Sequence, residues 1–581
     1  MIFTKIIRGF IRAYSALEDL SDYKDNALGL FALGLRFGLD DLSSIGVDAV
    51  TDGSDDKKLD IVFINSEEEY AVVGQCYYSE KEKQNAPSNK ASDLNTGVAW
   101  LLQRDINDVP ERIKSSAINL RQCIKDGSVK SIYLWYVHNL PESHHVESEL
   151  VTVQQTATSI LNKEYPGLKV DVSHKEVGSK SLQEWYEACR TPILINERVT
   201  LNTIGGYEIS GKGWSSYSTA IQARELAKLY KKHRTKIFSA NIRDYLGSRK
   251  SDSNINHGIK QTVENDASDF WAFNNGLTVL THDFSVDGNS VIIQGLSIVN
   301  GAQTTGAIGS LKKLPDEKAM VQARFIAVDS SSEYLIENII RYNNSQNKVE
   351  AADFRSTDKT QKRLKEEFNL IPDAEYEGGR RGSSSDVIRR RPNLLGSYTV
   401  GQALAAFHGD PITAYNKKAG IWINNKTYDK LFNDSTKAAH IICCFGLVRA
   451  IEAKKKQLQI KTSLTRDDEK YLTFLRQRGA VFLTTYAFSY CLETILDRSV
   501  PNLFRISFGV KCSPAKAVEN WKPVIDALLP FVDHLNPAIV NGLKNQSDIE
   551  QAVSTFNSLA KSVRTFNSAI FDSFKNKVTA P

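Results

Sequence analysis

The sequence predicts an α/β protein of several domains, and three observations lead to this prediction. A chain of 581 residues is too long to fold around one hydrophobic core. Helical and strand patterns alternate up to about residue 190, whereas only helical spacing of apolar residues is seen from about residue 430 onward. We therefore expect an α/β domain over 1–190, a central α+β domain over 191–425 and an all-α helical domain over 426–581.

The N-terminal region begins with a helical pattern over about 10–38 and continues with a β-hairpin. Two short apolar runs, KLDIVFIN and YAVVGQCYY, are joined by the polar residues 66–69, which is typical of a hairpin. SIYLWYVHN (131–139) is rich in β-branched and aromatic residues, which predicts a central strand. The remaining expected elements are helices over 107–125 and 146–163 and a last strand in LKVDVSH.

The central region contains more Gly, Asn and Ser and has weaker periodicity. We expect a helix over 217–233 and strands in DFWAFNNGLTVLTHDF, SVIIQGLSIVNG and VQARFIAV. A further helix is expected to begin in AQTTGAIGSLKKL, directly after the second of these strands.

Composition indicates an ordinary folded protein, and it argues against a disulfide-stabilised protein and against a membrane-spanning protein. The hydrophobic fraction of 41% and the charged fraction of 24% are typical of soluble domains. The seven cysteines form no C-x-x-C pair and have no histidine at zinc spacing, so we expect reduced, buried thiols rather than a disulfide framework. Basic residues interrupt the apolar N-terminus, and no segment reaches the length of a membrane span. We therefore expect a cytoplasmic protein with no membrane partner.

The hairpin carries a candidate metal site. Asp60 opens the first strand and Gln75 lies on the second, so that two hard oxygen ligands for Mg²⁺ or Mn²⁺ come from adjacent strands. The segment resembles the core of PD-(D/E)xK nucleases, most closely the Mrr-like form with Asp followed by Gln-x-Lys. This resemblance implies a restriction-endonuclease-like fold, in which Asp60 and Gln75 hold the metal.

The chain departs from that motif at its lysine position, which is Tyr77. A phenol does not supply a fixed positive charge, and Lys81 in the next turn is the candidate to supply it. The second acidic ligand is open, since the first helix and the following acidic loop offer four carboxylates: Glu18, Asp22, Asp48 and Asp52.

Two segments of the central region have the same pattern, an apolar run followed by Asn-Gly and flanked by further polar residues. Asn-Gly favours tight turns because both residues tolerate positive φ. The turn explains Asn275-Gly276 and Asn300-Gly301, but it does not explain Asn274, Gln303 and Thr304. A helix that begins after Gly301 would present these side chains beside free backbone amides, which favours an anion. The alternatives are recognition of a base or ribose and a buried amide network.

Four ordered motifs resemble the abortive-infection phage-resistance family, abbreviated AIPR. They are NIRDYLG (241–247), FWAFNNGLTVL (270–280), LSIVNGAQTTGAI (296–308) and RYNNSQNKVEAADFRSTD (341–358). The resemblance spans about 210–420 and implies bacterial defence against phage, with a nuclease-like domain at the N-terminus. A looser similarity to ParB-like nucleotide-binding domains implies a nucleotide or nucleic-acid site that includes Asn343 and Asn344.

The segment GGRRGSSSDVIRRR concentrates positive charge between glycines and serines. Such a loop is suited to contact phosphates, although a solvated basic loop is the alternative. Its arginines are Arg380, Arg381, Arg389, Arg390 and Arg391.

These observations predict a metal-dependent nuclease in anti-phage defence, controlled by a central sensing domain and acting on DNA or RNA. The alternative is a sensor or adaptor that has lost nuclease activity, which the tyrosine at position 77 favours. In a third hypothesis, the main activity is the binding or hydrolysis of a nucleotide in the central domain. The expected partners are nucleic acid, a nucleotide, and either a second copy of the chain or the product of a neighbouring defence gene.

Overall fold

The computed structural model describes most of the chain, and its residues form two compact units. The described residues are 2–39, 41–53, 55–190, 193–241, 251–328, 333–343, 355, 358–376, 378, 393–461, 463–540 and 542–579. The central unit comprises Met1–Ala16, Leu33–Gly38 and Ser179–Val349, and the flanking unit comprises Leu17–Ala32, Leu39–Gly178 and Glu350–Pro581. The predicted domain boundaries at 190 and 425 stay predictions. No helix among the described residues has the length and apolar character needed to cross a membrane.

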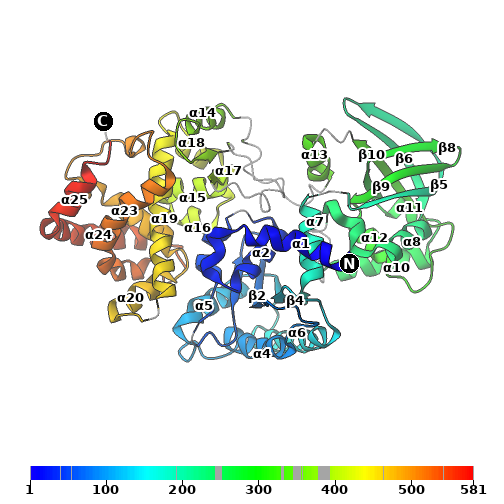
Figure 1. The fold of residues 1–581 in the computed structure, drawn as a ribbon, viewed down its shortest axis with the longest axis horizontal. Helices are drawn as coiled ribbons and strands as arrows, with labels where there is room; N and C mark the ends of the chain where they lie inside the picture. Colours follow the sequence, from blue (N-terminus) through cyan, green and yellow to red (C-terminus); the bar gives the residue numbers. More distant parts are fainter. Residues whose placement is uncertain are drawn as a thin grey trace. The chain divides into compact units, whose positions relative to one another are not determined.

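A mixed four-stranded sheet forms the N-terminal part of the flanking unit (Figure 1). Its strands lie in the order β1(Ile61–Asn65), β2(Tyr70–Tyr77), β3(Ser131–His138), β4(Asp171–Val177). β1 is antiparallel to β2, whereas β2, β3 and β4 are parallel. The predicted hairpin and the central strand are thereby confirmed, and the last strand lies three residues later than expected.

Helices complete this part of the flanking unit. They are η1(Glu18–Tyr23), α2(Asn26–Phe37), which is divided between the two units, α3(Leu42–Ala49), α4(Ser88–Leu102), α5(Glu111–Lys125) and α6(His144–Glu164). α4, α5 and α6 bury their apolar residues in one core with alternate residues of the sheet, such as Val62, Val73 and Leu134. This burial supplies the main stabilisation of the layer.

The rest of the flanking unit is helical, as expected from about residue 430. The helices are α14(Lys359–Phe368), α15(Ser397–Phe407), α16(Pro411–Asn416), α17(Gly420–Ile423), α18(Asn425–Leu431), α19(Ala438–Ile460), α20(Arg466–Leu475), α21(Ala480–Tyr490), α22(Leu492–Leu496), η4(Leu503–Arg505), α23(Pro514–Leu528), η5(Leu529–Ala538), α24(Gln546–Phe566) and α25(Ser568–Lys575), with a two-residue pairing of β11(Glu375–Tyr376) and β12(Leu394–Leu395). α19 is apolar on nearly every side for most of its length and lies in the core.

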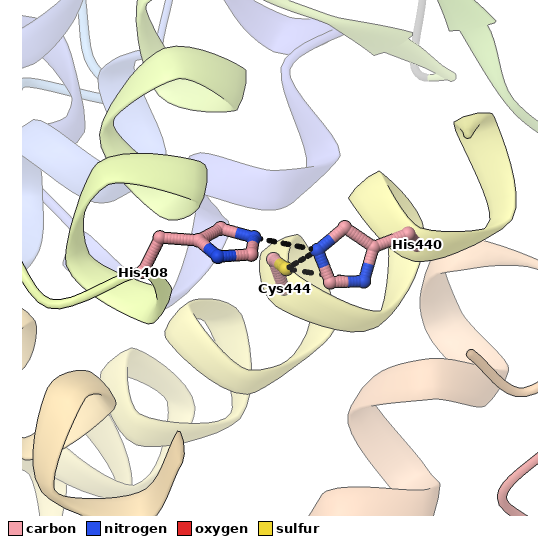
Figure 2. A group of neighbouring side chains, drawn as sticks. All are labelled: His408, His440 and Cys444. Atoms are coloured by element: carbon pink, nitrogen blue, oxygen red, sulfur yellow. Dashed lines mark hydrogen bonds between the residues drawn. The ribbon is translucent and has the colours of Figure 1, made fainter. Parts of the chain in front are cut away.

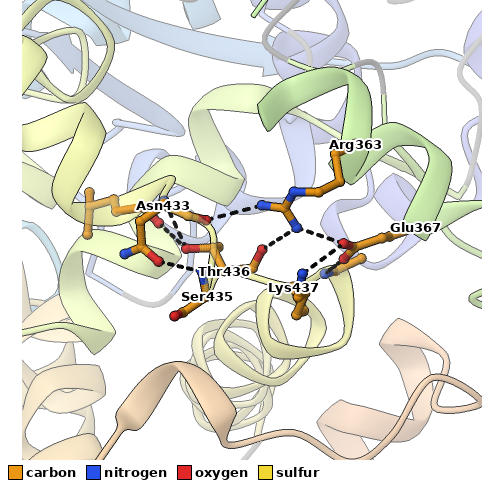
Figure 3. A network of polar contacts seen from close by, with 8 residues as sticks. Arg363, Glu367, Asn433, Ser435, Thr436 and Lys437 are labelled. Atoms are coloured by element: carbon orange, nitrogen blue, oxygen red, sulfur yellow. Dashed lines mark hydrogen bonds and ion pairs between the residues drawn. The ribbon is translucent and has the colours of Figure 1, made fainter. Parts of the chain in front are cut away.

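Polar contacts fix the entry to α19. Figure 3 shows Arg363 of α14, whose guanidinium donates to the backbone carbonyls of Thr436 (2.9 Å) and Asn433 (3.1 Å) and pairs with Glu367 (2.6 Å). Glu367 also accepts a hydrogen bond of 2.9 Å from the backbone amide of Ala438, the first residue of α19. A carboxylate at this position satisfies a free amide of the helix start.

Ion pairs join the N-terminal and helical parts of the flanking unit. Arg449 of α19 donates to Asp41, the N-cap residue of α3, at 2.5 Å and to Glu452 at 2.8 Å. Lys455, whose side chain is 2% exposed, pairs with Asp48 of α3. The N-terminal four-stranded sheet and the C-terminal helices therefore share one folded unit.

The central unit is built around a six-stranded sheet. The order is β5(Ile195–Gly211), β6(Trp214–Gln222), β10(Met320–Val328), β7(Leu277–Thr281), β9(Ser290–Asn300), β8(Asp283–Asp287), and a further pairing of β5 with β9 closes the order on itself. The helices are α1(Ile2–Ser15), α7(Ser179–Arg190), α8(Ala223–His233), η2(Arg234–Asn241), α10(Ser251–Asn265), α11(Phe270–Phe273), α12(Ala302–Gly309) and α13(Glu333–Asn343).

Two central predictions are wrong in part. Residues 217–222 belong to β6 and not to the expected helix, which begins only at Ala223. β6 pairs with β5 on one side and β10 on the other, and this sheet pairing overrides the helical pattern that continues into α8. The expected strand at 270–273 is instead the short helix α11, and its strand begins at Leu277. The strand over 290–300, the strand in VQARFIAV and the helix after Gly301 are confirmed.

Candidate functional site

The hairpin brings Asp60 to the end of β2. β1 begins at Ile61, which pairs with Gly74, and the backbone amide of Asp60, the residue before β1, donates to the carbonyl of Gly74 at 3.1 Å. The Asp60 carboxylate accepts a hydrogen bond of 2.7 Å from the backbone amide of Cys76. The Gln75 side-chain amide donates to the carbonyl of Lys58 at 2.9 Å. Asp60 therefore contacts both chain neighbours of Gln75, while metal binding by the two residues stays a prediction.

Gln75 has a buried acceptor without a partner. Its side chain is 4% exposed, and its Oε1 atom accepts no hydrogen bond from any described residue. A buried polar atom left without a partner costs about 1–3 kcal/mol. Native proteins keep few such atoms, and a bound ion is one of the usual reasons for them.

Three aspartates gather at the same place. Carboxylate oxygens of Asp52, Asp56 and Asp60 lie within 4.8 Å of one another. Burial raises the pKa of Asp60 to about 7, the Cys76 amide and the charge of Lys90 lower it, and the negative charges of Asp52 and Asp56 raise it further. Like charges at this separation disfavour one another unless a cation lies between them.

Among the four carboxylates that remained open, Asp52 belongs to this group. It also accepts a hydrogen bond of 2.9 Å from Asn26. Asp22 pairs with Lys456 and Asp48 with Lys455, while Glu18 lies in the first turn of η1. The sequence interpretation missed Asp56, although it stands in the same acidic loop as Asp52. The run of aspartates at 52, 55 and 56 was the available signal.

Two lysines gather at Tyr77, the position where the motif has lysine. The ammonium of Lys83 donates to the Tyr77 hydroxyl at 2.6 Å, and this bond lowers the pKa of the phenol. The ammonium groups of Lys83 and Lys90 lie 5.4 Å and 5.3 Å from the centre of the ring. Lys90 stands in the first turn of α4, and its charge reaches Asp60.

Lys81, the predicted source of positive charge, is not the lysine that contacts Tyr77. It is exposed in the loop after β2, where its backbone carbonyl accepts a hydrogen bond from Ser79. The charge beside Asp60 comes instead from α4. Only the packing of that helix against the sheet reveals this, because the motif spacing ends at the strand.

A polar row crosses three strands of the central unit. Asn300 of β9 pairs with Thr278 of β7, which pairs with Arg324 of β10. Side chains at paired positions project to the same face of a sheet. The Arg324 guanidinium donates to Thr278 at 3.2 Å and to the side-chain oxygen of Asn343, the last residue of α13. These four residues are called the central polar row. The sequence interpretation noted no arginine here, because Arg324 reaches the row only through strand pairing.

The two Asn-Gly segments are joined by one side chain. Asn274 accepts a hydrogen bond of 2.8 Å from the amide of Gly276 and donates to Thr304 at 3.1 Å. Both glycines have positive φ, +76° at Gly276 and +94° at Gly301. A Cβ at Gly301 would lie 2.7 Å from that of Leu277, so a side chain is excluded there. Asn274 and Thr304 thus have a structural role.

The other polar residues of these segments face solvent. Asn275, Asn300 and Gln303 are exposed, and Gln303 lies in the first turn of α12. The remaining residues predicted for this site lie outside the described residues: Asn344, Arg380, Arg381, Arg389, Arg390 and Arg391. Binding by these residues stays a prediction.

The sequence predicts that the cysteines are buried and that none has a histidine at zinc spacing. The structure confirms the burial and contradicts the second statement. All seven cysteines are buried, and no two of them form a disulfide. Cys444, however, lies beside His440, four residues earlier on α19, and beside His408. The pattern H-x-x-x-C on a helix places both side chains on one face.

The comparisons with known proteins give one match. Residues 238–527 match the model of the family described as AIPR protein, and no curated protein or solved structure matches the chain. The matched stretch begins within η2 and extends beyond the motifs to α23 of the helical region. The match over these residues supports the identification of this chain as an AIPR protein.

Proposed function

We propose that this chain is a metal-dependent nuclease that cleaves DNA or RNA during phage infection. The family match supports a role in abortive-infection defence against phage. The nuclease assignment rests on one observation, the unpartnered buried oxygen of Gln75, a residue whose neighbours Gly74 and Cys76 both contact Asp60. The resemblance of this hairpin to the PD-(D/E)xK core points to the same two residues.

The donor set fits a hard divalent cation. Asp60, Gln75, Asp52 and Asp56 offer only oxygen atoms, which suits Mg²⁺ or Mn²⁺. When bound, such an ion polarises a phosphoryl oxygen and lowers the pKa of a coordinated water. The ion would also partner the Gln75 oxygen and offset the repulsion among the three carboxylates.

The protein's own cations have a separate role. Lys90 at the start of α4 and Lys83 in the preceding loop hold positive charge beside Asp60 and Tyr77. A scissile phosphate held at the carboxylates would meet this charge, which stabilises the negative charge that develops on its oxygens. The lysine missing from β2 is thus replaced from α4 and from the preceding loop.

The test of the proposal is cleavage by the purified full-length protein. Plasmid, single-stranded DNA and RNA are incubated with the protein in Mg²⁺, in Mn²⁺ and in excess chelator. We expect metal-dependent cutting of at least one substrate. Retained nucleic-acid or nucleotide binding without any cutting would instead favour the sensor or adaptor function.

Lys90 provides a specific prediction. Lys90→Ala is expected to slow cleavage on the order of 100-fold, because a positive charge aimed at the reacting phosphate is removed. The measurement is the single-turnover cleavage rate at saturating metal. The matched control is Lys81→Ala, since Lys81 is an exposed lysine of the same region and should leave the rate unchanged. Equal rates for both variants would remove Lys90 from the site.

The central polar row favours a second activity, recognition of a phosphate-bearing ligand by the central unit. Arg324 is exposed and is held by Thr278 and Asn343 on the face of the sheet that carries Asn300. A fixed guanidinium beside amide side chains suits a phosphate and the polar edge of a base. This arrangement supports the sensing part of the proposal.

Arg324→Ala is expected to weaken nucleotide or oligonucleotide binding by roughly 10- to 100-fold, the value of one charge-assisted hydrogen bond. Isothermal titration with ATP, GTP, CTP and a short oligonucleotide measures the change. Lys318→Ala is the control, because Lys318 is an exposed cation in the turn before β10. If none of these ligands binds the unmodified protein, the central row is not a phosphate site.

A further inference from the structure

Two histidines and one cysteine converge in the helical part of the flanking unit (Figure 2). His408 follows the last residue of α15, while His440 and Cys444 lie one turn apart on α19. The Nε2 atoms of His408 and His440 are 2.9 Å apart, and the Cys444 sulfur lies 3.3 Å from Nε2 of His440. Three atoms that each bind metals thus point at one place.

The orientation of His440 is fixed from behind. Its Nδ1 atom lies 2.7 Å from the backbone carbonyl of Ile506. A carbonyl oxygen only accepts, so Nδ1 carries the hydrogen and Nε2 keeps its lone pair toward His408 and Cys444. Metal-binding histidines are usually held in this way by an acceptor on the second ring nitrogen.

The surroundings keep the donors in place. The His408 ring stacks on Phe504 with 3.9 Å between ring centres, and Phe407 contacts both histidine rings edge-on. His440 and Cys444 are fully buried or nearly so. Burial lowers the pKa of His440 to about 4 and lowers that of His408, so both imidazoles are neutral. Burial raises the pKa of the Cys444 thiol, so a bound metal would displace its proton.

We propose that His408, His440 and Cys444 bind a Zn²⁺ ion. One thiolate and two imidazoles form a borderline-soft donor set that suits zinc and not the Mg²⁺ of the Asp60 site. Tetrahedral zinc with ordinary bond lengths separates two nitrogens by about 3.3 Å and nitrogen from sulfur by about 3.6 Å. The observed separations of 2.9 Å and 3.3 Å need to widen by only a few tenths of an ångström.

The ion has two consequences for the chain. It ties the end of α15 to α19 inside the stretch that matches the AIPR family. Three protein ligands leave a fourth position for water or another small ligand, since zinc is normally four-coordinate.

The test uses the full-length protein in two steps. Metal analysis of protein purified without chelator is expected to find about one zinc per chain. Replacement by Co²⁺ is expected to give thiolate-to-cobalt charge-transfer absorption in the near ultraviolet and strong visible bands of a four-coordinate ion. Cys444→Ser should abolish the charge-transfer band, whereas Cys443→Ser, a buried thiol next to it on the same helix, should keep it.

Three results would overturn the assignment. They are absence of zinc and cobalt binding in the unmodified protein, a charge-transfer band that persists in Cys444→Ser, and binding of copper without zinc. If Cys444→Ser does not fold, the cobalt spectrum of the unmodified protein and of His408→Asn decides, because the loss of one imidazole must shift the visible bands.

Discussion

Asp60→Ala is expected to abolish metal-dependent nucleic-acid cleavage and, with it, protection of cells against phage. Asp60 belongs to the aspartate group, and its carboxylate is fixed to β2 by a hydrogen bond from the backbone amide of Cys76, the residue after Gln75. Even residues that only orient metal ligands contribute about 10–100-fold, so loss of a ligand should lower the cleavage rate by at least roughly 100-fold. Single-turnover cleavage and plaque counts measure the two effects.

Asp93→Ala is the matched control for this prediction. Asp93 is a carboxylate of α4 that pairs with Lys58 at 3.3 Å and lies outside the aspartate group. We expect this variant to cleave and to protect as the unmodified protein does. Unchanged protection in Asp60→Ala, with the protein present at normal levels, would rule out the nuclease as the source of defence.

Asp60→Asn is expected to make the metal-free protein more stable than the unmodified protein at neutral pH. The folded-state pKa of Asp60 is about 7, whereas an unfolded aspartate has a pKa near 3.9. The folded state therefore holds the proton to higher pH than the unfolded state does. The unmodified protein loses stability as the pH rises from about 4 to about 7 and no further above that range. Asparagine has no such dependence.

The size of this difference follows from the shift in pKa. One pKa unit corresponds to about 1.4 kcal/mol. The free energy of unfolding of Asp60→Asn should therefore exceed that of the unmodified protein by at most about 4 kcal/mol above pH 7, and the difference should vanish near pH 4. Urea unfolding of both proteins in chelator, at pH values from 4 to 8, measures it. Parallel pH profiles would show that Asp60 is not held in a desolvated acidic site. Added Mg²⁺ should reduce the difference in free energy of unfolding between the two proteins, because it stabilises the unmodified protein.

The N-terminal part of the candidate site was predictable because it depends on local pairing. Two apolar runs joined by a short polar turn define a hairpin, and the hairpin places Asp60 beside the strand that carries Gln75. The same reasoning led to a metal but could not supply the cation. The charge of Lys90 acts on Asp60 from a helix whose direction is set by its packing on the sheet, which no spacing in the sequence records.

In the central region, the sequence indicated one contact correctly but failed to identify residues that are brought together by strand pairing. The extra polar residues at 274 and 304 marked a real contact, since their side chains bond across 30 positions. Arg324 was not recognised because its neighbours in space come from strands distant in sequence. The strand at 217–222 was taken for a helix because it runs without a break into α8, and only its two strand partners decide its conformation.

The ion pairs between α3 and α19 can form only after both partners have been synthesised. Asp41 and its partner Arg449 are 408 positions apart. At about 5–20 residues per second, Arg449 is made roughly 20–80 s after Asp41. During that interval the nascent hairpin with its acidic group is complete in sequence, but the helices that share its folded unit do not yet exist. A chain that ends before α19 lacks Arg449 and Lys455, so its Asp41 and Asp48 cannot form these ion pairs.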